Sequence, residues 1–135
     1  MPREQLPVAD FQHVLAIVNE ARSRALRAVN AEMIQMYWNV GEYLSKLCAD
    51  ASYGDKVIPE VAAYIAHEAP GLKGFTRPNL YRMKQFYEAY YEDEIVSPLV
   101  RQLSWTNHLI ILSGAKTAEA RRFYVQLCIK EHYSK

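Results

Sequence analysis

Residues 70–90 read PGLKGFTRPNLYRMKQFYEAY, and this stretch decides the fold prediction because it holds the clearest turn and the clearest helix start. The run Pro70–Gly74 predicts a turn, since proline and glycine interrupt regular structure. Thr76 is placed to cap the helix that follows, and Pro78 falls in its first turn, where a missing N–H loses no partner. The apolar side chains on one face of this helix, which runs to about residue 90, are Leu80, Met83, Phe86, Tyr87 and Tyr90.

The segments on both sides also predict helices and no convincing strand. Apolar or small side chains recur every three or four positions from Asp10, a plausible N-cap, to about Ala49, with one interruption at Arg22. They are Phe11, Leu15, Val18, Ala25, Val29, Met33, Met36, Val40, Leu44 and Leu47. The other predicted helical segments are Lys56–Glu68, Ile95–Leu103, Trp105 to about Leu112 and Ala118 to about His132. Ser104 and Thr117 are placed to cap the last two segments, and Gly114 is expected to end the helix that begins at Trp105.

The fold class is therefore predicted to be all-α, with a long N-terminal helix and a helix-turn-helix, winged-helix-like segment at about 56–90. Residues 1–9 are expected to be a flexible N-terminus and residues 10–135 one helical domain. A 40-residue helix reaches ~60 Å, which is more than a small domain needs. Either it breaks near Asn30 or it extends beyond the domain and packs against another chain. We favour an extended helix, or two in near succession, with homo-oligomerisation.

Composition narrows the class of protein. Hydrophobic residues make up 50% of the 135 residues and charged residues 23%, which favours one globular domain over disorder. The net charge of +1 does not by itself indicate an acidic partner. Cys48 and Cys128 belong to no CxxC pair, so two buried thiols in a reducing compartment are expected. No signal pattern or membrane-length apolar run is present, which predicts a cytoplasmic protein without a membrane partner.

Charge is unevenly distributed, because residues 71–87 contain four basic side chains and no acidic one. Lys and Arg neutralise phosphates, Arg and Gln can read base edges, and a helix N-terminus favours an anion. The candidate nucleic-acid-binding residues are Lys73, Thr76, Arg77, Asn79, Tyr81, Arg82, Lys84 and Gln85. An ordinary solvated helix face is the alternative interpretation of the same residues.

Motifs for catalysis are missing from the sequence. It contains no GxxxxGK[ST], GxGxxG, HExxH or CxxC, and no ExK or DxK that would suit a metal-dependent nuclease. His108 lies three positions after Trp105 and is interpreted as a structural contact, because no nucleophile spacing accompanies it. We therefore predict no catalytic residue, no metal or cofactor and no small-molecule substrate.

Several motifs together resemble the N-terminal domain of the YhcG-type family, long described as a domain of unknown function. The matching stretches are residues 37–41 (YWNVG), 53–57 (YGDKV), 70–76 (PGLKGFT), 79–87 (NLYRMKQFY) and 102–105 (QLSW), with His108. The resemblance implies a helix-turn-helix-like DNA-binding part that usually precedes a PD-(D/E)xK nuclease domain, which is absent from this chain. Asn107 stands where relatives often have His, which weakens a paired-histidine role.

Three hypotheses follow. In the first, the chain binds DNA, with Lys73, Arg77, Arg82 and Lys84 on phosphates and Asn79, Tyr81 and Gln85 near bases or sugars. In the second, it is a helical dimerisation or protein-interaction module without direct nucleic-acid contact. The third, an enzyme, has the least support.

Overall fold

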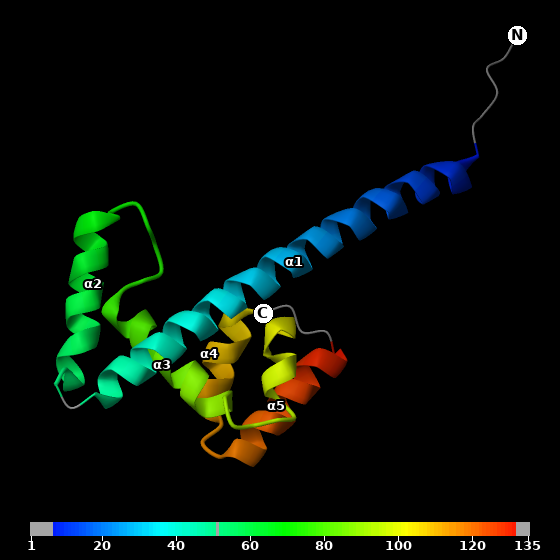
Figure 1. The fold of residues 1–135 in the computed structure, drawn as a ribbon. Helices are drawn as coiled ribbons and strands as arrows, with labels where there is room; N and C mark the ends of the chain where they lie inside the picture. Colours follow the sequence, from blue (N-terminus) through cyan, green and yellow to red (C-terminus); the bar gives the residue numbers. More distant parts are fainter. Residues whose placement is uncertain (1–6, 51, 132–135) are drawn as a thin grey trace, which may run out of the picture.

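The computed structural model describes residues 7–50 and 52–131, and every regular element among them is helical (Figure 1). The prediction of an all-α fold is confirmed. In chain order the elements are α1 (Val8–Ala49), the 3-10 helix η1 (Gly54–Lys56), α2 (Val57–Glu68), α3 (Arg77–Tyr90), the 3-10 helix η2 (Ser97–Gln102), α4 (Trp105–Gly114) and α5 (Ala118–Glu131).

The N-terminal helix α1 is a single helix of 42 residues, with no break at Asn30. It begins at Val8, so Asp10 lies in its first turn and the predicted N-cap at Asp10 is wrong; Pro7 occupies that position. The predicted flexible segment 1–9 therefore overlaps the helix from Val8 on, and residues 1–6 lie outside the described part of the chain. Asn30 instead ties α1 to the body, because its Nδ2 donates to the backbone oxygens of Arg101 and Leu103 at 3.2 and 2.8 Å.

Two apolar clusters hold the C-terminal half of α1 against the other helices. The larger cluster joins Ile34 of α1 to Phe86 and Tyr90 of α3, and reaches Val100 of η2 and Val125 of α5. The smaller one joins Leu44, Val57, Ile58, Leu80 and Met83, and so connects α1, α2 and α3. Because α3 contributes to both clusters, it is the central helix of the body.

The N-terminal half of α1 makes no such contacts. Every residue from Val8 to Val29 is exposed, and Figure 1 shows this part of α1 extending away from the other helices. Asn30 is the first residue of α1 that is partly covered. We call residues 8–29 the arm.

The helix caps and ends predicted from the sequence are confirmed in part. The hydroxyls of Ser104 and Thr117 accept hydrogen bonds from the backbone N–H groups of Asn107 and Ala120, each at 3.1 Å, as caps of α4 and α5. Gly114 is the last residue of α4, as expected. Thr76 occupies the N-cap of α3, but its side chain makes no capping hydrogen bond.

The connection between α2 and α3 spans residues 69–76, which is longer than the five-residue turn predicted from the sequence. The chain leaves α2 after Glu68, and Gly74 adopts a φ of 89°, a conformation that other residues rarely take. Phe75 then packs against the cluster that contains Leu80, so the chain is fixed just before α3 begins. The two helices thus have helix-turn-helix proportions with a longer turn.

Candidate nucleic-acid interface

The candidate residues gather around one exposed face of α3. Leu80, Met83, Phe86 and Tyr90 are buried, so the residues between them point outward. Arg77, Tyr81 and Gln85 follow one another at steps of four and are all exposed, with Tyr81 retaining 45% of its accessible surface. A guanidinium, a phenol ring and an amide therefore stand in one row on the solvent side of the helix.

One edge of this row adjoins α4. Arg82 is exposed, and its Nη1 donates to Ser113 Oγ at 3.3 Å. A guanidinium has five N–H donors, so this single bond leaves most of them for an anion. The contact with Ser113 lowers the freedom of a long side chain and thereby favours one position for its charge.

The opposite edge of the row adjoins α1, and its cation, Lys84, is paired with a carboxylate. Lys84 Nζ lies 3.1 Å from the Glu88 carboxylate, one turn further along α3, and is only partly exposed. The same carboxylate accepts a hydrogen bond of 2.7 Å from Ser45 Oγ of α1. Lys84, which was predicted to contact phosphate, therefore differs from the other cations of this surface, because the Glu88 carboxylate matches its charge.

The remaining candidates lie at the start of α3. Lys73 and Thr76 are exposed, whereas Asn79 is half-buried and faces the packed side more than the row. No acidic residue occurs in the first turn of α3, and none occurs in the sequence between Glu68 and Glu88. The free N–H groups of the helix N-terminus and the side chains of Lys73 and Arg77 thus give this end a positive field.

His108 does not belong to this surface. It is fully buried, its ring centroid lies 4.7 Å from that of Phe86, and its Nε2 donates to the Val100 oxygen at 2.7 Å. Burial lowers the pKa of the imidazole to about 4, against a weaker opposite effect of the hydrogen bond to Val100. His108 is therefore neutral at pH 7 and serves to join α3, η2 and α4.

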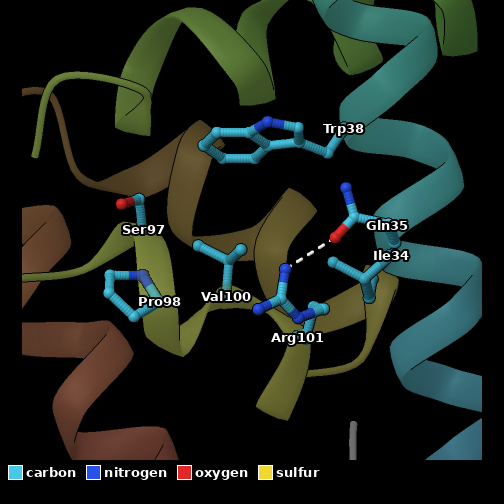
Figure 2. Close-up of a pocket in the computed structure, with 7 residues that line it drawn as sticks. All are labelled: Ile34, Gln35, Trp38, Ser97, Pro98, Val100 and Arg101. Atoms are coloured by element: carbon cyan, nitrogen blue, oxygen red, sulfur yellow. Dashed lines mark hydrogen bonds between the residues drawn. The ribbon is translucent and has the colours of Figure 1, made fainter. Parts of the chain in front are cut away.

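A groove lies between α1 and η2, and no sequence pattern predicted it. Its volume is about 350 Å³, and Figure 2 shows its wall at Trp38 and its rim at Arg101. Arg101 Nη1 donates to Gln35 Oε1 at 2.6 Å. The complete lining is Ile34, Gln35, Trp38, Ser97, Pro98, Val100 and Arg101. It offers one guanidinium and one hydroxyl but no carboxylate, imidazole or thiol that could act as a base.

The described ranges, 7–50 and 52–131, contain no group of three or more His, Cys, Asp or Glu side chains placed to hold a metal ion. None of the helices in these ranges combines the length and apolarity that crossing a bilayer requires.

Comparison with known proteins gives one match. The family model described as the DUF1016 N-terminal domain matches residues 13–135, which is most of the chain. The resemblance to the YhcG-type N-terminal domain is thereby confirmed. No curated protein and no solved structure matches the chain.

Proposed function

We propose that this chain, which belongs to the DUF1016 N-terminal domain family, is a non-catalytic module that binds DNA through the exposed face of α3. The observation that carries the proposal is the row Arg77, Tyr81 and Gln85, which stands in solvent on a stretch of chain without acidic residues. Phosphate attraction supplies most of the affinity of such surfaces, and side chains of this kind add contacts to bases and sugars.

The roles within the surface differ. Arg77, Arg82 and Lys73 neutralise phosphates, and Thr76 supports an anion at the helix N-terminus. Tyr81 and Gln85, at the centre of the row, are placed to contact sugars or base edges. Asn79 is half-buried and Lys84 is paired with Glu88, so we assign both a smaller part.

The body of the domain supports α3 in this role. The cluster of Leu44, Val57, Ile58, Leu80 and Met83 fixes the back of α3 against α1 and α2. A rigid helix with a solvated front is the arrangement that helix-turn-helix proteins present to the major groove. In relatives that carry a nuclease domain, such a module would deliver that domain to DNA.

Electrophoretic mobility shift at two salt concentrations tests the proposal. We expect the affinity of the wild-type chain for duplex DNA to fall steeply as salt rises, because bound phosphates release counterions. Arg77→Glu/Arg82→Glu should abolish binding at the higher salt concentration. Lys56→Glu/Lys130→Glu, which makes the same change of charge at two exposed lysines elsewhere, should retain it.

A second comparison stays within the row. Arg77→Gln should reduce the slope of log affinity against log salt by roughly one phosphate contact, and Lys84→Gln should change it less. Circular dichroism checks that each variant keeps its helices. The proposal fails if the wild-type chain does not bind at low salt, or if both double variants weaken binding equally.

A further inference from the structure

The arm carries an apolar stripe that nothing in the described chain covers. Phe11, Leu15 and Val29 retain 53%, 58% and 60% of their surface, although they lie on one face of α1. The same spacing continues to Val40, Leu44 and Leu47, which pack in the smaller cluster beside α2. One continuous stripe is thus buried at its C-terminal end and open along the arm, and open stripes of this kind mark interaction sites.

We propose that the arm pairs with the arm of a second copy of this chain, in antiparallel orientation. This inference is independent of the proposed DNA binding, because the arm and the exposed face of α3 share no residue. Two lines of argument lead to it: the position of Arg22 within the stripe, and the amount of apolar surface that the arm leaves open.

The antiparallel orientation explains why Arg22 interrupts the stripe. When Leu15 of one copy lies opposite Val18 of the other, Phe11 faces Arg22. A guanidinium over an aromatic ring is a favourable contact, and the long stem of Arg22 can pack on apolar neighbours. A parallel pair would place the two Arg22 side chains against each other within the stripe.

The available surface is sufficient for a dimer. The apolar side chains that stay open on this face of α1 between residues 7 and 26, the segment that the second arm covers, are Val8, Phe11, Val14, Leu15, Val18 and Leu26. At roughly 100 Å² each they offer about 600 Å² per copy and about 1,200 Å² in the pair, which is the lower limit for a stable interface. A second arm presents the same area to this surface.

Sedimentation velocity across about 1 μM to about 1 mM protein is the primary test. We expect a concentration-dependent dimer for the wild-type chain. Val18→Asp, at the centre of the proposed pair, should raise the dissociation constant at least about a hundredfold, because two carboxylates would be buried without partners. Ala16→Asp, which places the same acid on the opposite side of the same helix, should leave it nearly unchanged.

Cysteine cross-linking then tests the orientation. Under mild oxidation an equimolar mixture of Phe11→Cys and Arg22→Cys should form a disulfide-linked dimer that neither variant forms alone, because position 11 of one copy faces position 22 of the other. In a parallel pair each variant would cross-link with itself, because identical stripe positions face each other. The wild-type chain, which has Cys48 and Cys128, controls for cross-links elsewhere.

Two outcomes overturn the proposal. A wild-type chain that stays monomeric up to about 1 mM means that the stripe has another occupant, such as a different protein or a further part of a longer chain. A dimer that Val18→Asp leaves intact means that the pairing surface lies outside the arm. Neither outcome bears on DNA binding, which the substitutions at Arg77 and Arg82 address separately.

Discussion

Gly41 lies at a close contact between α1 and α3, and replacing it with alanine tests how tightly the two helices are packed. A Cβ at position 41 would overlap the backbone oxygen of Met83 and come within 2.7 Å of the Met83 carbonyl carbon. It would also lie 3.1 Å from Tyr87 Cβ. Because the atoms at Met83 belong to the backbone, no side-chain rotation relieves the overlap, and α3 must move away from α1.

Two effects of Gly41→Ala oppose each other. Alanine in a helix interior is favoured over glycine by about 1 kcal/mol. Overpacking a filled interior costs roughly 1–3 kcal/mol, and the upper end applies where the backbone must shift, so we expect a net loss of about 2 kcal/mol. For a chain of 135 residues, whose unfolding entropy is roughly 0.3 kcal/mol per degree, this corresponds to a Tm lowered by about 7 °C.

Differential scanning calorimetry on the wild-type chain, Gly41→Ala and Gly114→Ala measures the effect. Gly114 is also helical, but an added Cβ there meets nothing within 4 Å, so its substitution reports helix propensity without overlap. We expect Gly114→Ala to leave the Tm unchanged or slightly raised. If Gly41→Ala behaves in the same way, the close approach of α1 and α3 is not a feature of the folded protein.

Two further substitutions test buried contacts of α4. His108 has a folded-state pKa of about 4, below the ordinary 6.5, so its contribution to stability is complete above pH 6.5 and is lost as pH falls towards 4. Urea unfolding at pH 7 and pH 4.5 measures this loss. Between the two pH values the free energy of unfolding of the wild-type chain should fall by roughly 2–3 kcal/mol more than that of His108→Gln. Equal losses would contradict the assignment of His108 as a buried, neutral side chain. Ser104→Ala should lower the free energy of unfolding by about 1 kcal/mol, because Ser104 accepts the N–H of Asn107, whereas Thr76→Ala should cost less, because Thr76 makes no capping hydrogen bond. Thermal unfolding of both variants decides whether the two caps differ.

Local patterns predicted most of the helices of this chain. The helical period gave α1, α2, α3 and α5, and the capping residues Ser104 and Thr117 gave the starts of α4 and α5, because these signals depend on neighbours within a turn. The start of α1 was missed, because the helix begins at Val8 with Pro7 as its N-cap, whereas Asp10 was the predicted N-cap. A break near Asn30 was considered because of the length of the helix, yet α1 is continuous there and the Asn30 amide bonds to residues more than 70 positions away.

The candidate site shows the same division between local and distant information. The periodicity of Leu80, Met83 and Phe86 was sufficient to predict that Arg77, Tyr81 and Gln85 face solvent. The pairing of Lys84 with Glu88 was available as a four-residue spacing on one helix. The contacts of Ser45 with Glu88 and of Ser113 with Arg82 were not, because each joins helices that only the tertiary fold brings together.

The groove of Figure 2 could not be predicted from local sequence patterns either. Its walls come from α1 and η2, which only the tertiary fold brings together. Trp38 lines it and also meets Phe86 and Tyr87 edge to face, with ring centroids 5.5 and 5.2 Å apart. The ring therefore packs on the back of α3 while one side stays open to the groove. The packing of Trp38 against α3 is a sufficient reason for a tryptophan at position 38. No ligand in the groove is needed to explain this residue.

The arm and the exposed face of α3 constrain each other through the length of α1. In the proposed pairing the centre of the dimer lies near Ile17, and α3 approaches α1 at Gly41, 24 residues further along the helix. At 1.5 Å per residue this places each α3 about 36 Å from the centre, so the two copies lie about 70 Å apart. Helix-turn-helix dimers contact half-sites separated by one turn of DNA, about 34–36 Å, or by multiples of it, and 70 Å corresponds to two turns. This spacing requires that α1 is one uninterrupted helix whose first half extends from the body. A break near Asn30 would leave the separation of the two α3 helices undefined.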